Sequence, residues 1–175
     1  MSAGALRKST KTGFLYSTEE RRRRDESVWT LVQGILAPVQ FLVFLISLAL
    51  IVYYLATGDG LTAAKLSVVI KTLTLYAIMI TGSIWEKQVF GCYLFARPFF
   101  WEDVFSMLVL ALHTAYLAAL YLDALSPAGL MMLALAAYAT YVVNAGQFVW
   151  KLRLARLDQS ARQQASDLQG VEAVQ

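Results

Sequence analysis

The chain has 175 residues, of which 58% are hydrophobic and 15% are charged, and its formal net charge is +3. A soluble domain is usually about 45–50% apolar and about 25% charged, so this composition excludes an ordinary soluble protein and indicates one integral membrane domain. The basic residues flank apolar segments, which indicates a topology signal rather than a nucleic-acid partner. Cys92 is the single cysteine, so an internal disulfide and a multi-cysteine metal site are excluded.

Four continuous apolar stretches are each long enough to cross a bilayer as a helix of about 20 residues. They run from about Val28 to Ala56, Leu61 to Trp85, Phe99 to Leu122 and Ala128 to Trp150. Their apolar residues do not alternate, so they predict helices rather than the strands of a barrel. The predicted fold is therefore an all-α integral membrane protein with four transmembrane helices. Turn formers predict tight connections at residues 57–60 and 123–127, whereas the connection 86–98 is longer.

The distribution of Lys and Arg predicts the orientation. Outside the spans, these residues occur in the N-terminal segment, in the connection 86–98 and in the C-terminal tail, but not in the two short turns. The positive-inside rule therefore places both termini in the cytoplasm. Ser17 and Glu20 predict a capping box, from which a short charged helix leads into the first span. We expect a flexible N-terminus over 1–16, a four-helix domain with this interfacial helix over 17–157, and a polar cytoplasmic tail over 158–175 that frays.

Polar side chains within the spans form two layers when depth is counted at about 1.5 Å per residue. The shallow layer contains Gln33, Glu86, Glu102, Asp103, Asn144 and Gln147, and the deeper layer contains Gln40, Lys71, His113 and Thr140. Within each helix the polar residues recur at helical spacings, so they share a face. Such groups are expensive to bury in hydrocarbon and usually face a bundle interior, where they serve a function. The pattern predicts one interior cavity open toward the cytoplasm.

Each of these signals has a structural alternative. Amide and hydroxyl side chains often join helices by hydrogen bonds. Lys71 could snorkel or pair with a carboxylate, and His113 could be a satisfied interior histidine. Glu102 and Asp103 lie at a helix start, where they meet the helix dipole favourably. The aromatic residues between Trp85 and Trp101 suit a membrane interface, and they would also stack on a flat ligand.

The motifs that the chain lacks narrow the chemistry. With one histidine, bis-histidine haem ligation within the chain is impossible, and no CxxC, HExxH, Walker A or GxGxxG pattern occurs. What remains is acid–base chemistry on a lipophilic substrate, or passive binding.

Three strings carry a resemblance to a known family. They are residues 21–45 (RRRRDESVWTLVQGILAPVQFLVFL), 81–87 (TGSIWEK) and 99–116 (FFWEDVFSMLVLALHTAY). They resemble the 3-vinyl bacteriochlorophyllide hydratase family of phototrophic bacteria, and the likeness extends from about Tyr16 to Leu157. The resemblance implies hydration of the C3 vinyl group of chlorophyllide a, or of a related 3-vinyl bacteriochlorophyllide, to a 1-hydroxyethyl group. It also implies a bacterial inner membrane, the intracytoplasmic photosynthetic membrane, and a step toward bacteriochlorophyll.

Hydration of a vinyl group needs a proton donor, a positioned water and stabilisation of the cation between them. The residues predict Glu102 as the acid, with Asp103 or Glu86 holding the water. No redox cofactor is needed, because hydration transfers no electrons, and no protein-held metal is expected.

The other polar residues are predicted to hold the pigment. His113 could ligate the substrate's central Mg²⁺ or orient Glu102, and Asn144 and Gln147 could bind water or ring carbonyls. Gln33, Gln40 and Lys71 are further candidates for binding within the interior. Arg97, Lys87 or the cluster 21–24 could meet the propionate.

Two other functions stay open at this point. The first is a non-catalytic pigment carrier or photosystem assembly factor that uses the same pocket. The second is a small transporter with Lys71 and Glu102 on an ion path. The expected partners are the pigment and membrane lipids, without nucleic acid. A homodimer is an open alternative, because four helices are few to enclose a macrocycle, and so are contacts with other pigment-biosynthesis enzymes.

Overall fold

The computed structural model describes residues 16–172, and the expectations for residues 1–15 and 173–175 lie outside the described residues. This range contains five α-helices and no strand. They are α1 (Thr18–Glu26), α2 (Val28–Thr57), α3 (Leu61–Phe90), α4 (Phe100–Tyr121) and α5 (Pro127–Glu172). Helices α2, α3 and α4 and the part Pro127–Leu157 of α5 are long and apolar enough to cross a membrane. The predicted all-α fold with four candidate membrane spans is confirmed.

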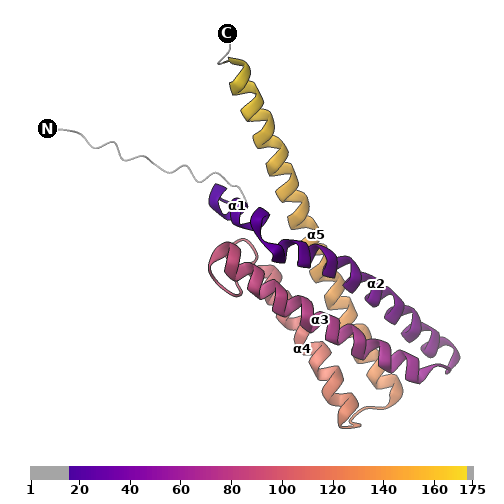
Figure 1. The fold of residues 1–175 in the computed structure, drawn as a ribbon. Coiled ribbons are helices and arrows are strands. Elements are labelled where there is room, and N and C mark those ends of the chain that lie inside the picture. The colour runs from indigo at the N-terminus through magenta and orange to yellow at the C-terminus, as the bar shows by residue number, and fades with distance from the viewer. Residues whose placement is uncertain (1–15, 173–175) are drawn as a thin grey trace.

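The four long helices form two antiparallel hairpins, α2 with α3 and α4 with α5 (Figure 1). Gly58 and Gly60 both have φ of 81°, which glycine adopts without strain, so α2 reverses tightly into α3. The second turn ends at Ser126, whose hydroxyl accepts a hydrogen bond of 3.2 Å from the Gly129 amide at the start of α5. Both turns lie at one end of the bundle, the short-turn end. Helix α1, the α3–α4 loop and the extension of α5 lie at the other, the α1 end (Figure 1).

Helix α1 begins with the predicted capping box. The Glu20 amide donates to the Ser17 hydroxyl at 3.2 Å, and the Ser17 amide donates to the Glu20 carboxylate at 2.8 Å. The helix does not run on into the first span as expected, because Ser27 adopts an extended conformation and ends it. The Ser27 hydroxyl instead caps α2 by accepting a hydrogen bond of 3.2 Å from the Trp29 amide. The charged helix can therefore lie at an angle to the span that follows it.

Two helices are longer than the apolar stretches predict. Helix α3 continues beyond Trp85 to Phe90 and ends where Gly91 takes φ of 85°, so Glu86 lies in the helix and not in a loop. Helix α5 continues past Lys151 to Glu172. The segment that was expected to fray, 158–175, contains five Gln and three Ala, which are good helix formers.

Two apolar clusters hold the helices together. The larger joins all four long helices around Phe44, Val68, Tyr116 and Met131, and buried alanines such as Ala134 let the backbones approach. The smaller lies at the α1 end and packs Tyr16, Val89 and Phe99 with Trp85 and Phe90. Burial in this cluster raises the pKa of the Tyr16 phenol.

Candidate active site

Three carboxyl groups are buried together at the α1 end of the bundle. Glu86 lies one turn before the end of α3, and Glu102 and Asp103 lie in the first turn of α4. They are 5%, 5% and 3% exposed. Glu86 and Asp103 lie close enough for their side chains to interact.

The α3–α4 loop folds back over this acid pair. The Phe95 amide donates to Asp103 Oδ2 at 2.7 Å, and the Ala96 amide donates to Glu86 Oε2 at 3.2 Å. Phe95 has φ of 61°, a conformation that is uncommon for a residue with a side chain. The loop therefore takes an unusual backbone shape while both amides donate to the acid pair.

Glu102 is held separately by α5. Its Oε1 atom lies 3.4 Å from Lys151 Nζ, which also donates a hydrogen bond to the Pro98 carbonyl. One turn further into the bundle, the Asn144 amide donates to the Ser106 hydroxyl at 2.9 Å. These two contacts join α4 to α5 along the polar faces that the sequence predicts.

Three acceptor oxygens in this shallow layer have no hydrogen-bond partner among the described residues. They are Glu102 Oε2, Asn144 Oδ1 and Gln147 Oε1, and all three are buried. Gln147 lies between Asn144 and Lys151 on α5, one turn from each. All three atoms accept hydrogen bonds, so the group suits a small donor such as water.

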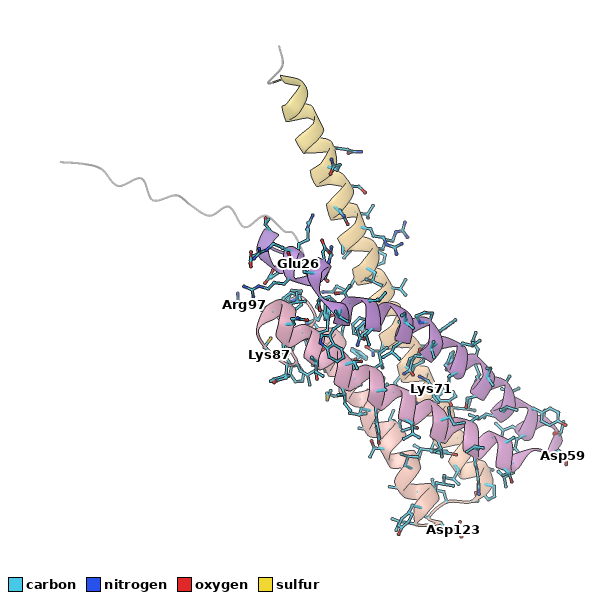
Figure 2. All side chains as sticks on the ribbon, in the orientation of Figure 1. Glu26, Asp59, Lys71, Lys87, Arg97 and Asp123 are labelled. Atoms are coloured by element: carbon cyan, nitrogen blue, oxygen red, sulfur yellow. The ribbon has the colours of Figure 1, made fainter. Side chains whose placement is uncertain are left out.

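The deeper layer is centred on Lys71 and His113, which are fully buried. Figure 2 shows Lys71 midway along the bundle, whereas Lys87 and Arg97 lie at the α1 end and Asp59 and Asp123 at the short-turn end. Lys71 Nζ lies 3.6 Å from the centroid of the Tyr141 ring, a cation–π contact. Within the described range, neither Lys71 Nζ nor either polar side-chain atom of Gln40 has a hydrogen-bond partner. A buried polar group without a partner is costly, so this layer calls for a functional explanation.

His113 presents one free ring nitrogen. Its Nδ1 atom lies 2.8 Å from the Val109 carbonyl, which can only accept, so Nδ1 carries a hydrogen. Nε2 is buried and has no partner among residues 16–172. Histidines that ligate metals usually donate the other ring nitrogen in this way.

Tyrosines complete the deeper layer. The Tyr138 hydroxyl donates to the Ser47 hydroxyl at 2.6 Å, and Ser47 and Ser67 are joined at 2.6 Å. The Tyr138 ring stacks on His113 at 5.8 Å between centroids. Tyr116, Tyr138 and Tyr141 are not predicted from the sequence as site residues, because tyrosine also belongs to the apolar pattern of a membrane span. Their helical spacing to His113 and Asn144 was the signal that could have revealed them.

Several predicted residues lie outside these two layers. The Gln33 side-chain amide donates to the Thr81 hydroxyl at 2.7 Å and so joins α2 to α3, and Thr140 bonds to its own helix. Arg97 is exposed on the α3–α4 loop. Lys87 donates to the Gly91 carbonyl at 2.9 Å, which closes the end of α3.

The aromatic residues near the loop divide into two sets. Trp85, Phe90 and Phe99 pack against one another and against Tyr16, so their faces are occupied by protein. A second set is exposed and comprises Tyr93, Phe95, Phe100 and Trp101. The sequence suggested that the aromatic residues between Trp85 and Trp101 could stack on a flat ligand. In the structure only the second set has exposed rings that could do so.

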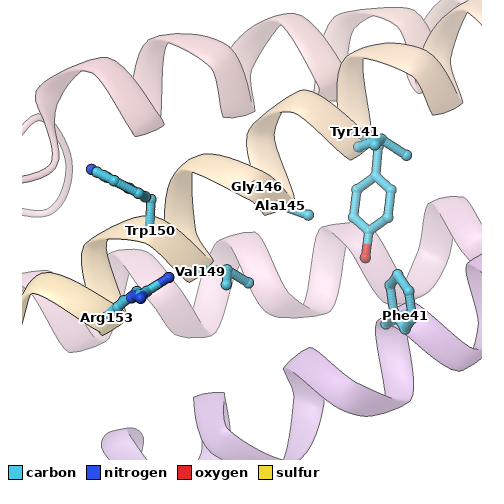
Figure 3. A pocket seen from close by; sticks show the side chains of 8 residues that line it. Phe41, Tyr141, Ala145, Gly146, Val149, Trp150 and Arg153 are labelled. Carbon is cyan, nitrogen blue, oxygen red and sulfur yellow. The ribbon is translucent and has the colours of Figure 1, made fainter. Parts of the chain in front are cut away.

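A groove of about 520 Å³ runs between α2 and α5 (Figure 3). Its lining includes Phe41 and Tyr141 and contains none of the predicted site residues. Within the described part of the chain, no group of three or more His, Cys, Asp or Glu side chains could hold a metal ion.

The fold and its interior define a helical protein with four candidate membrane spans and a cluster of buried carboxyl groups. The profile of the 2-vinyl bacteriochlorophyllide hydratase family matches residues 16–154. The chain therefore belongs to the 2-vinyl bacteriochlorophyllide hydratase family. The position numbered 2 in this description and the C3 position named above are the same ring carbon in two numbering schemes.

Two relatives are similar over most of their length. The 2-vinyl bacteriochlorophyllide hydratase of Cereibacter sphaeroides is 67% identical over 150 residues, which cover 85% of this chain and 92% of that protein. The protein of the same name from Rhodobacter capsulatus is 63% identical over 155 residues, which cover 88% of this chain and 89% of that protein. No solved structure matches the chain.

Proposed function

We propose that this chain adds water to the vinyl group of chlorophyllide a, or of a related vinyl bacteriochlorophyllide, to give the 1-hydroxyethyl product. The observation that carries the proposal is the identity of 67% and 63% to two hydratases over nearly their whole length. In this reaction the terminal vinyl carbon gains a proton, and the carbon attached to the ring gains the hydroxyl group of water. No electrons are transferred, so the chain's own acids and bases are sufficient for the chemistry.

The acid pair of Glu86 and Asp103 is the best placed proton donor. The Phe95 and Ala96 amides hold the two carboxyls in place. We infer that the two carboxyls share one proton, because two neighbouring buried carboxyls cannot both carry a charge without strong repulsion. Glu102, which the sequence suggested as the acid, forms an ion pair with Lys151. A carboxylate in an ion pair is a poor proton donor, so we assign the donor role to the acid pair and a different role to Glu102.

Glu102 is suited to hold the attacking water. With Asn144 and Gln147 it offers three buried acceptor atoms that no described residue engages. A water that donates its two hydrogens to Glu102 and to one of the amide oxygens keeps a lone pair free for the cation on the ring-attached carbon. Glu102 then takes the proton that this water loses, and its negative charge also stabilises the cation.

The deeper layer is suited to hold the macrocycle. His113 Nε2 can ligate the magnesium of the substrate, because Nδ1 is already bonded to the Val109 carbonyl. Lys71 and the Gln40 amide can donate to carbonyl oxygens at the edge of the ring. His113 lies about 16 Å along α4 from Glu102 at about 1.5 Å per residue, which leaves room for a large pigment between the two layers.

We also propose that the α1 end faces the cytoplasm, in the intracytoplasmic photosynthetic membrane. Helix α1 and the extension of α5 lie at the same end (Figure 1), and this end carries the chain's arginine-rich segments. Residues 17–157 would then form the catalytic membrane domain, and the part of α5 beyond it would stand in the cytoplasm.

The test uses membranes from a host that makes no chlorophyll. Chlorophyllide a is added in ¹⁸O-labelled water to membranes with and without the chain, and the pigment is analysed by mass spectrometry. We expect a product heavier by one labelled water only where the chain is present. Unchanged pigment that co-purifies with the folded protein would overturn the proposal in favour of a carrier, and gradient-dependent uptake into vesicles would favour a transporter.

A further inference from the structure

The groove between α2 and α5 is of ligand size. It is lined by Phe41 of α2 and, on α5, by Tyr141, Ala145, Gly146, Trp150 and Arg153 among others (Figure 3). Its volume of about 520 Å³ lies within the range of about 300–1,000 Å³ that is usual for small-molecule sites. From Tyr141 to Arg153 the helix rises by about 18 Å, a span on the scale of a tetrapyrrole with its propionate arm.

The α1 end of this groove is cationic. Arg153 is exposed, and no ion pair joins it to any carboxylate whose side chain the structure describes. Its guanidinium matches the planar geometry of a carboxylate. Beside it, Trp150 offers an aromatic ring for stacking.

The floor of the groove lies at a glycine. A side-chain atom added at Gly146 would meet nothing within 4 Å, so the space above α5 is open there. A flat ring can therefore lie close to the α5 backbone.

The inner end of the groove leads to the deeper polar layer. Tyr141 and Phe41 point toward each other across it (Figure 3), and the Tyr141 ring contacts Lys71 on its face. Gln40, next to Phe41 in the chain, is buried. Tyr141 thus separates an apolar outer groove from buried polar groups that no described residue satisfies.

We propose that this groove is the docking site of the tetrapyrrole substrate, with its propionate at Arg153 and its ring over Gly146, before the reacting edge passes Tyr141. The proposal rests on the proposed function for the identity of the substrate. A lipid chain would also fit an apolar groove, but it cannot form hydrogen bonds with the polar groups behind Tyr141. The ring carbonyls of the pigment can accept such hydrogen bonds.

The experiment measures equilibrium binding as well as turnover. The full chain is placed in lipid nanodiscs, and the Kd values of chlorophyllide a and of its propionate methyl ester are measured by absorbance titration. Gly146→Leu fills the groove and should raise both Kd values by about tenfold or more. Gly34→Leu is the matched control, because Gly34 is also helical, has open space around it and does not line the groove.

Arg153→Gln tests the charge. We expect it to raise the Kd of the free acid by about fivefold, which is the upper end for an exposed ion pair, and to leave the Kd of the ester unchanged. Arg156→Gln, on the same helix but outside the groove, should alter neither.

Each outcome decides the proposal. Wild-type affinities in both Gly146→Leu and Arg153→Gln would show a surface that meets only lipid and would overturn it. A wild-type protein that binds but does not hydrate, with the expected variant effects, would sustain the docking site and remove the proposed function. A wild-type protein that does not bind the pigment would overturn both.

Discussion

Replacing Glu102 by Gln keeps the shape and one acceptor of this side chain but removes its ability to take a proton. If Glu102 is the base, the hydration rate should fall by about 10²- to 10⁴-fold, the usual contribution of a general base. At about 1.4 kcal/mol per tenfold, this is about 3–5 kcal/mol of transition-state stabilisation. Because the change leaves the deeper layer intact, the affinity for chlorophyllide should stay within about threefold.

The structural cost of the same change should be smaller. Glu102 loses one ion pair, but Lys151 keeps the Pro98 carbonyl as an acceptor. Removing one partner of a buried ion pair usually lowers the free energy of unfolding by about 3–5 kcal/mol, because the other charge is left unpaired. The loss for Glu102→Gln should be smaller than this. Initial rates of product formation are measured beside thermal unfolding and pigment binding, with Glu26→Gln on exposed α1 as the control for loss of a carboxylate. A Glu102→Gln protein that turns over within threefold of the wild type would refute the assignment of the base.

Four further changes test other parts of the site. Asp103→Asn should lower the hydration rate by at least about 10²-fold because the shared proton is lost; full activity in an assay of initial rates would exclude the acid pair as the donor. His113→Ala should weaken pigment binding by about tenfold or more, and added imidazole should restore it, whereas unchanged affinity in the nanodisc titration would remove His113 from the site. Lys71→Met should raise the free energy of unfolding by about 1–3 kcal/mol, since an unsatisfied buried group is removed, and should weaken pigment binding; a less stable variant in a denaturant titration would instead indicate a structural lysine. Ser17→Ala should cost about 1 kcal/mol of α1 stability through loss of the cap, seen as faster hydrogen exchange of the Glu20 amide, while hydration continues; unaltered exchange would contradict the capping box.

The sequence was sufficient to predict the parts of this fold that depend on local pattern. Four uninterrupted apolar runs specify four helices. In lipid, only a helix or a closed barrel pairs all of its backbone hydrogen-bonding groups, and the runs do not alternate as barrel strands do. The capping box at Ser17 is equally local, and so is the start of α4, which brings Glu102 and Asp103 together. The polar faces of α4 and α5 were also predictable, and the Asn144–Ser106 and Glu102–Lys151 contacts follow from them.

The parts that depend on tertiary contact could not be predicted. The α3–α4 loop owes its shape to two hydrogen bonds with the acid pair and to the positive φ of Phe95, and neither is encoded in its composition. Gln33 shares the heptad spacing of Gln40, yet it points to Thr81, because spacing within one helix does not say which neighbour a face will meet. The groove beside Arg153 was not expected because it lies on the face of α5 that carries no polar stripe.

The tight turn between α2 and α3 bears on how the protein reaches the membrane during synthesis. Lys71 near the middle of a lone helix would oppose insertion by about 2.5–3.5 kcal/mol. Helix α2 contains no charged residue, and Gly58 and Gly60 reverse the chain at its end without strain. We expect the translocon to release α2 and α3 together as a hairpin, so that the favourable partition of the first helix carries the lysine of the second into the bilayer. Insertion as a hairpin would thus allow Lys71 to reach the bilayer interior, where the folded bundle is proposed to use it for binding the pigment.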